Sequence, residues 1–179
     1  ITSNKASWIF RISAQGVSAH GARPWLGKNA IEILMRCIPD VLALFPARGQ
    51  QGVWENTCNI GRIEGGRASN QVPDSAYLLL DVRMVETADS HAVLAQLQHA
   101  VTSHGCTLEV LETGIVSHTP STNEHLARYT EIAQAVSGAS VQHLHSEGAD
   151  DGRFFSRHNI PVICSRPKSD GQHSDHEWA

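Results

Sequence analysis

The most constraining stretch of this sequence runs from Ala76 to Val85 and reads A-Y-L-L-L-D-V-R-M-V. One set of alternate positions is wholly apolar, while Tyr77, Asp81 and Arg83 fall on the other set. Successive side chains of a strand point to opposite faces of a sheet, so this period of two predicts a strand with one apolar face. Arg83 is therefore expected on the less apolar face.

The segments around this strand predict the order β-α-β-β-α-β. Aromatic and β-branched clusters indicate the strands, and apolar residues at helical spacing indicate the helices. Pro39 is expected to kink or shorten the first helix, and Gly105 stands where the second should end. The order is typical of a ferredoxin-like α+β fold, an antiparallel sheet with two helices on one face. The predicted strands are 7–13, 56–65, 76–85 and 107–112, and the predicted helices are 29–44 and 88–104.

A second, shorter α/β pattern begins near Ser117. The motif S-T-N-E from Ser121 resembles a capping box in front of a helix. A short strand at 140–144, a turn and helix start at 148–155 and a buried strand at 161–164 are expected to follow. This alternation is too short to build its own sheet, so we interpret it as part of a larger domain.

Composition excludes several classes of protein. A formal net charge of −4 argues against a nucleic-acid-binding surface, and no apolar run is long enough to span a membrane. The chain has neither a signal peptide nor an initiator methionine, so we expect a fragment. Four scattered cysteines without a C-x-x-C pair favour buried, reduced thiols and a cytoplasmic location. They are Cys37, Cys58, Cys106 and Cys164.

Two histidine-bearing stretches carry the candidate chemistry. The run from Gly16 to Ala30 places His20 in a loop of small residues with Gly and Pro, just before a helical pattern. The last residues, from Gly171, contain His173, Asp175, His176 and Glu177. Metal-dependent hydrolysis needs such groups, but a complete metal site needs more of them than this chain visibly supplies.

Several motifs occur in a fixed order from about Trp8 to Trp178. In this order the chain resembles the zinc-dependent amidohydrolase and peptidase family of acetylornithine deacetylase, succinyl-diaminopimelate desuccinylase and glutamate carboxypeptidase. The resemblance implies a lid, or dimerisation, domain at 1–115 and an incomplete C-terminal segment of the catalytic domain at 116–179. The motifs are G-V-S-A-H-G-A-R-P-W-L-G-K-N-A-I, N-I-G-R-I-E-G-G-R-A-S-N-Q-V-P-D-S-A, L-D-V-R, E-G-A-D-D-G-R-F-F, N-I-P-V-I and H-S-D-H-E-W.

The resemblance assigns roles to three residues of the lid. His20 would reach into the active site of the partner subunit and stabilise the developing oxyanion. Asn70 would hydrogen-bond substrate, and Arg83 would hold a substrate carboxylate. Each has a simpler alternative: a loop histidine capping the next helix, a turn-forming asparagine, and a cross-strand salt bridge near Asp81.

The second segment carries two further candidates. By resemblance His173 is a metal ligand, with His176 and Asp175 in supporting or surface roles; alternatively these residues form a solvated tail. Gly148 would let the backbone approach the substrate. Asp150 or Asp151 close by could simply cap a helix.

The function implied is hydrolysis of an amide bond in N-acyl amino acids or small peptides by a cytoplasmic homodimer. One or two Zn²⁺ ions, with Co²⁺ or Mn²⁺ as alternatives, would support the intact enzyme, and the isolated chain is expected to be inactive. Two alternatives stay open: a non-catalytic dimerisation module, and a ferredoxin-like regulatory domain that binds a small molecule.

Overall fold

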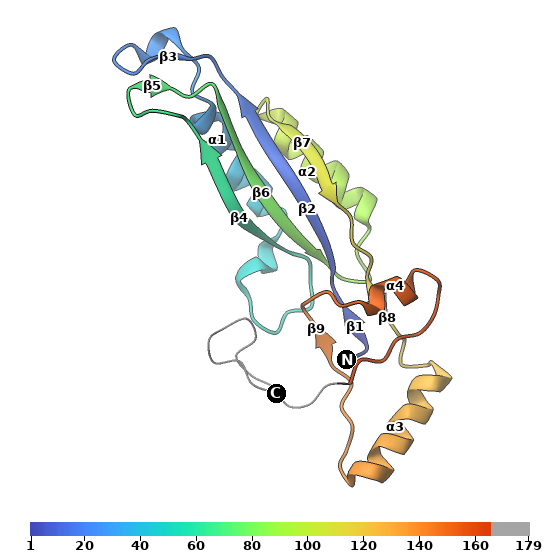
Figure 1. Ribbon diagram of the computed structural model, residues 1–179. Coiled ribbons are helices and arrows are strands. Elements are labelled where there is room, and N and C mark those ends of the chain that lie inside the picture. Colours follow the sequence, from blue (N-terminus) through green and yellow to red (C-terminus); the bar gives the residue numbers. More distant parts are fainter. Residues whose placement is uncertain (166–179) are drawn as a thin grey trace. The chain divides into compact units, whose positions relative to one another are not determined.

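The computed structural model describes residues 1–165. It divides the chain into two compact units, Lys5–Val116 and a second unit that joins Ile1–Asn4 to the chain from Ser117 onward. Among the described residues no helix is long and apolar enough to cross a membrane. The two units are described separately below (Figure 1).

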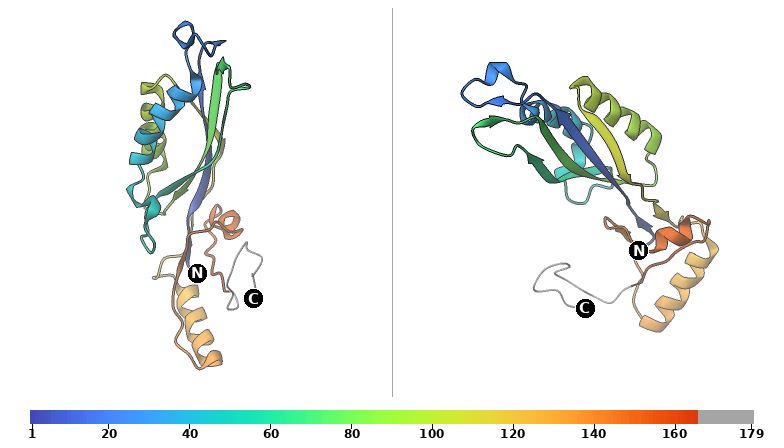
Figure 2. Two further views of the ribbon diagram at one scale, coloured as in Figure 1. Left: turned by 90° about the vertical axis from the view of Figure 1, so that its left-hand side faces the viewer. Right: turned by 45° about the horizontal axis from the view of Figure 1, so that its top comes forward.

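The unit Lys5–Val116 is an antiparallel sheet with two helices on one face, as Figure 2 shows. Its strand order, β4-β6-β2-β7, places the two longest strands in the centre. The predicted ferredoxin-like order is therefore confirmed. In chain order the elements are β2 (Ala6–Gln15), α1 (Ala30–Ala43), β4 (Thr57–Gly65), β6 (Ser75–Met84), α2 (Ser90–Ser103) and β7 (Thr107–Glu112).

The core lies between the sheet and the helices. The alternate apolar residues of β6 face it, and Leu80 and Val82 are fully buried. The register sets Phe10 of β2 against Leu80, and Phe10 is also fully buried. The period of two in the sequence thus identified the buried face of the central strand correctly.

Side chains and glycine fix the helix ends. Asn29 caps α1 by accepting hydrogen bonds from the N–H groups of Ile31 and Glu32. Gly105, with φ of +70°, takes the left-handed conformation just after α2. Pro39 does not end α1, which continues to Ala43. Pro39 lies on the exposed side of the helix, where the carbonyl that loses its partner can bond to water.

The second unit has very short strands. β1 (Ser3–Asn4) pairs with β8 (Ser117–His118) on one side and β9 (His145–Ser146) on the other. It also holds two helices, α3 (Glu124–Ser137) and α4 (Gly152–Ser156).

Three local predictions in this unit were wrong. Asn123 rather than Ser121 caps α3, because Asn123 directly precedes the helix and its Oδ1 accepts the N–H groups of His125 and Leu126. Residues 140–144 are not a strand, and the pairing falls on 145–146. Residues 161–164 are partly exposed and form no strand, although their backbone bonds to Ile1 and Thr119.

Candidate functional site

His20 and Asn70 meet at one end of the sheet of the unit Lys5–Val116. There, β3 (Ala19–His20) pairs with β5 (Gln71–Val72), and His20 lies opposite Gln71. The N–H of Gly21 donates to the carbonyl oxygen of Asn70 at 2.7 Å. We call this end, residues 16–30 with 70–73, the tip (Figure 1).

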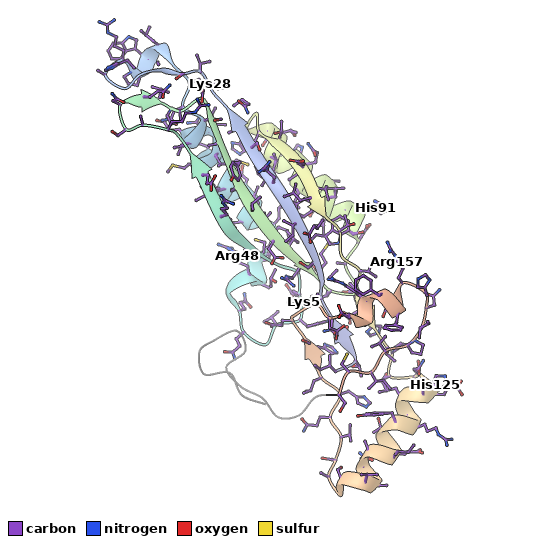
Figure 3. The ribbon with its side chains drawn as sticks, in the orientation of Figure 1. Lys5, Lys28, Arg48, His91, His125 and Arg157 are labelled. Carbon is purple, nitrogen blue, oxygen red and sulfur yellow. The ribbon has the colours of Figure 1, made fainter. Side chains whose placement is uncertain are left out.

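Glycines allow the backbone segments of the tip to approach one another. A Cβ at Gly21 would lie 2.9 Å from the carbonyl carbon of Asn70. A Cβ at Gly16 would lie 2.0 Å from the carbonyl oxygen of Lys28, whose side chain Figure 3 labels at the base of the tip. A Cβ at Gly27 would lie 2.6 Å from the carbonyl oxygen of Val17. Real Cβ atoms do not come this close to backbone, so the glycines are needed for chain packing.

The ring of His20 is exposed and oriented by one hydrogen bond. Its Nδ1 accepts the N–H of Ala22 at 3.1 Å. Because Nδ1 accepts, the neutral ring carries its proton on Nε2, which is then a donor. His20 does not cap the following helix α1, since Asn29 does, so that simpler role is wrong.

Arg83 lies far from the tip on the same unit. It is near the end of β6, whereas Asn70 precedes the start of that strand at Ser75. At about 3.3 Å per residue, Ser75 and Arg83 are roughly 26 Å apart. The guanidinium donates to Asp81 Oδ2 at 2.7 Å, and both side chains are about 30% exposed. This bridge joins two residues of β6 and does not cross strands, so it differs from the cross-strand salt bridge expected as the simpler role. Other N–H groups of Arg83 stay available.

Gly148 lies in the second unit and does not need to be glycine. Its carbonyl oxygen accepts the side-chain N–H of Asn4 at 2.8 Å, and an added Cβ would meet only Ser146 Oγ, at 3.9 Å. Gly152, by contrast, has Val162 Cγ1 2.8 Å from the position of an added Cβ. The steric requirement for glycine in this motif therefore falls on Gly152.

Asp150 organises the turn before α4. One carboxylate oxygen accepts the N–H of Gly152 at 2.9 Å, and the other accepts the thiol of Cys164 at 2.9 Å. Burial of the thiol is the main cause that raises the pKa of Cys164 to about 11, and the hydrogen bond to Asp150 and its charge raise it further. The N-cap position of α4 belongs to Asp151, whose side chain makes no capping hydrogen bond, while Asp150 accepts the N–H of the first residue of that helix.

The proposed metal ligand His173 lies outside the described residues, as do Asp175 and His176. Within residues 1–165 no three His, Cys, Asp or Glu side chains come together as a metal site would require. The described part of the chain therefore does not supply the ligand set of a metal ion by itself.

A charged network that sequence analysis did not predict occupies the open face of the sheet. Glu64 accepts hydrogen bonds from the hydroxyl of Tyr77 at 2.6 Å and from Arg62. Both hydrogen bonds lower the pKa of Glu64, and the bond from Tyr77 has the larger effect. Arg11 stacks on the Tyr77 ring, with its guanidinium carbon 4.5 Å from the centroid. The side chains of this network contact one another along the surface, which fits a structural role.

Sequence reasoning also missed two residues of the tip. Gln71 lies opposite His20 and donates through Nε2 to Ser18 Oγ at 2.5 Å, tying β5 to the His20 loop. Trp25 is 74% exposed in the short 3-10 turn η1 (Pro24–Leu26). The signal available was an aromatic residue beside proline in a loop of small residues.

The profile of the peptidase dimerisation domain matches residues 2–106. The chain belongs to this family. The predicted membership of the peptidase and amidohydrolase group is confirmed, and peptidases of this family are generally metal-dependent.

Two curated relatives are probable carboxypeptidases. One, from Talaromyces marneffei, is 38% identical over 91 residues, which are 47% of this chain and 20% of the relative. Another, from Aspergillus flavus, is 32% identical over 112 residues, which are 58% of this chain and 27% of the relative. The chain thus spans only about a fifth to a quarter of these relatives.

Solved structures share the fold. Aminopeptidase PepT from Bacillus cereus superposes with a TM-score of 0.77 at 22% identity, covering 99% of this chain and 48% of that one. An amidase of the hydantoinase/carbamoylase family from Burkholderia phymatum gives 0.69 at 18% identity, covering 90% and 41%. At these identities the likeness concerns the fold alone.

Proposed function

We propose that the full-length protein is a homodimeric, metal-dependent hydrolase of amide bonds in N-acyl amino acids or small peptides. In this proposal His173 is one ligand of a site for one or two Zn²⁺ ions, with Co²⁺ or Mn²⁺ as substitutes. The bound metal would polarise the amide carbonyl and activate water. Family membership and the relatives that are peptidases support this proposal. The free cysteines fit a reducing compartment such as the cytoplasm.

The orientation of His20 carries the proposal. Because Nδ1 accepts the N–H of Ala22, the neutral ring offers an Nε2–H donor that needs no reorientation. Such a donor can stabilise the negative charge that develops on a carbonyl oxygen under attack. Asn70, held beside His20 by the bond from Gly21, would bind a polar group of the same substrate.

The separation of Arg83 from the tip supports action across a dimer. Ser75, at the tip end of β6, is already roughly 26 Å from Arg83, which is more than a small N-acyl amino acid can span. Such a substrate therefore cannot contact both His20 and Arg83 of one chain. In a symmetric dimer, one chain can supply His20 and Asn70 while the other supplies Arg83 for the substrate carboxylate. This grouping sets Asn70 with His20 and apart from Arg83.

Mixed dimers test the proposal. Full-length His20→Ala should keep about a hundredth of wild-type activity on a panel of N-acyl amino acids and dipeptides, and His173→Ala should be inactive. Mixed and allowed to exchange subunits, they should recover about a quarter of wild-type activity, because half of the dimers then contain one intact site. Refolding each variant alone is the control. If dimers exchange and no activity returns, His20 does not act in trans.

The alternative of a non-catalytic dimerisation module has specific support for the 179-residue chain. The matched region, residues 2–106, is a dimerisation domain, and residues 1–165 contain no metal cluster. The 179-residue chain by itself is therefore expected to dimerise without hydrolysing amides and to bind zinc weakly at most. Zinc-supported turnover by this exact chain, measured with the same substrate panel, would contradict that expectation. The regulatory-domain alternative loses its support with the match to a peptidase family.

A further inference from the structure

The tip that carries His20 exposes large apolar side chains to solvent. Trp25 is 74% exposed, Leu26 62% and Val17 55%. The exposure of Trp25 exceeds that of every other large apolar residue described in the unit Lys5–Val116. Apolar side chains gathered at one end of a domain typically mark a surface that another molecule covers.

The other tryptophans of the same unit provide an internal comparison. Trp8 and Trp54 are partly buried, and their indole N–H groups donate to the Gly114 carbonyl at 2.9 Å and to Glu86 Oε2 at 2.8 Å. Among the described residues, the structure records no hydrogen bond from the indole of Trp25. Trp8 and Trp54 have structural roles in their own chain, whereas Trp25 has no such role.

The tip is rigid enough to present these side chains in a fixed direction. Val17 and Lys28 exchange two backbone hydrogen bonds at its base, of 2.8 and 2.9 Å. The 3-10 turn is closed by the N–H of Gly27 on the carbonyl of Pro24 at 3.0 Å, and Pro24 fixes its own φ. A preorganised turn loses little conformational freedom on binding, which favours an anchoring role.

We propose that Trp25 and Leu26 anchor the tip in the partner subunit of the dimer and so position His20 there. The inference rests on the proposed function, in which His20 acts in trans. The second copy is the occupant because the family is one of dimerisation domains. Its relatives are also four to five times longer than the matched region, so each partner carries a large body outside this domain. Trp is among the residues that most often dominate such contacts.

Photocrosslinking of the full-length protein tests the location of Trp25. Trp25→p-benzoylphenylalanine should give a covalent dimer on irradiation, visible by denaturing electrophoresis. The matched control is Met35→p-benzoylphenylalanine, on a 60% exposed residue of α1 in the same unit and outside the tip, which should give much less. A Trp25 probe that reacts only within its own chain, or not at all, overturns the inference.

Kinetics test whether Trp25 and Leu26 are positioning residues that act through His20. Trp25→Ser and Leu26→Ser should each lower kcat about tenfold, because a misplaced His20 donor weakens the transition state. KM should rise by a smaller factor, because Asn70 is displaced with the tip. His20→Ala should lower kcat about a hundredfold, and the double variant His20→Ala with Trp25→Ser should be no worse. Full additivity, or a Trp25→Ser kcat within about twofold of wild type, contradicts the inference.

These outcomes separate the two proposals. If mixed dimers of the His20 and His173 variants recover activity while Trp25 neither crosslinks nor affects kcat, the function stands and the anchor is wrong. If the mixed dimers exchange subunits and recover nothing, His20 does not act in trans and both fail. A protein that light scattering shows to be monomeric at assay concentration overturns both.

Discussion

The two units of this chain differ sharply in how much apolar surface they bury. Every buried apolar side chain of residues 1–165 belongs to Lys5–Val116 except one, Leu126 in α3. The first unit has central strands of 10 residues, whereas β1, β8 and β9 have two residues each. The first unit has the core of an independent domain, and the described part of the second, up to residue 165, does not.

The second unit instead exposes apolar residues on both of its helices. Val136 and Ile132 of α3 are 84% and 54% exposed, and Phe154 and Phe155 of α4 are 54% and 55% exposed. Apolar side chains at this density are normally covered in a native protein. Since the relatives are several times longer than the matched region, we expect other parts of the full-length protein to cover these helices. The comparison teaches that one unit stabilises itself and the other depends on what surrounds it.

The rate of hydrogen exchange in the 179-residue chain should show the largest difference between the two units. Backbone amides in β2 and β6 should exchange only through global unfolding of Lys5–Val116, because they lie in the centre of the sheet. Amides in α3 should exchange through local opening, at least about a thousandfold faster. Mass spectrometry of peptic fragments after deuterium labelling measures both. Equal protection of α3 and β6 would show that the second unit is self-sufficient.

Truncation of one leucine in each unit should give the next largest difference. Leu80 and Leu126 are both 1% exposed or less. Leu80→Ala should lower the free energy of unfolding of the sheet unit by about 3 kcal/mol, because it leaves a cavity in a closed core. Leu126→Ala should change the same transition by less than about 0.5 kcal/mol, because a cavity in one compact unit leaves the packing of the other unit intact. Urea unfolding followed by circular dichroism compares them, and similar losses would refute the division into independent units.

The buried thiols should make the first unit sensitive to alkaline pH. Burial of the thiol is the main cause that raises the pKa of Cys37 from an ordinary value of 9.0 to about 12, and the neighbouring Cys106 raises it further. A raised folded-state pKa favours the protonated thiol, so its contribution is fully present below pH 9 and is lost as pH rises from 9 to 12. Cys37→Ala should therefore flatten the fall of unfolding free energy across that window, measured by urea titrations at several pH values. An unchanged slope would show that Cys37 does not ionise on unfolding.

Removal of the two asparagine caps should give the smallest effects. Asn29→Ala should lower the free energy of unfolding of the sheet unit by about 1 kcal/mol, since α1 packs on the sheet and loses its N-cap. Asn123→Ala should leave that transition unchanged and reduce only the helical signal of α3. Circular dichroism at 222 nm during urea unfolding reports both. A shared loss of stability would join the two units into one cooperative fold.

Sequence reasoning succeeded where the signal was periodic and failed where it was local and weak. The alternation in β6 and the helical spacing around Leu34 predicted both the elements and their buried faces. In the second unit the apolar residues lack a core to face, so the same patterns predicted strands at 140–144 and 161–164 that do not form. A capping motif also pointed to Ser121, although Asn123 stands next to the helix.

The candidate site was predicted as a set of residues and not as an arrangement. His20, Asn70 and Arg83 could each be chosen from their motifs, but sequence spacing does not tell which of them meet in space. His20 and Asn70 are 50 positions apart in sequence but close in space, because β3 pairs with β5. Asn70 and Arg83 are only 13 positions apart but far from each other in space, because most of the intervening chain is the extended strand β6.

The sequence by itself determined the ferredoxin-like order of elements, the buried face of the sheet and the family, because hydrophobic periodicity and local motifs are properties of the chain. Only the tertiary structure decided that His20 and Asn70 share one tip while Arg83 lies elsewhere, and that Trp25 is exposed beside His20. The physical reason is that strand pairing joins residues distant in sequence, and exposure depends on what the whole fold leaves uncovered.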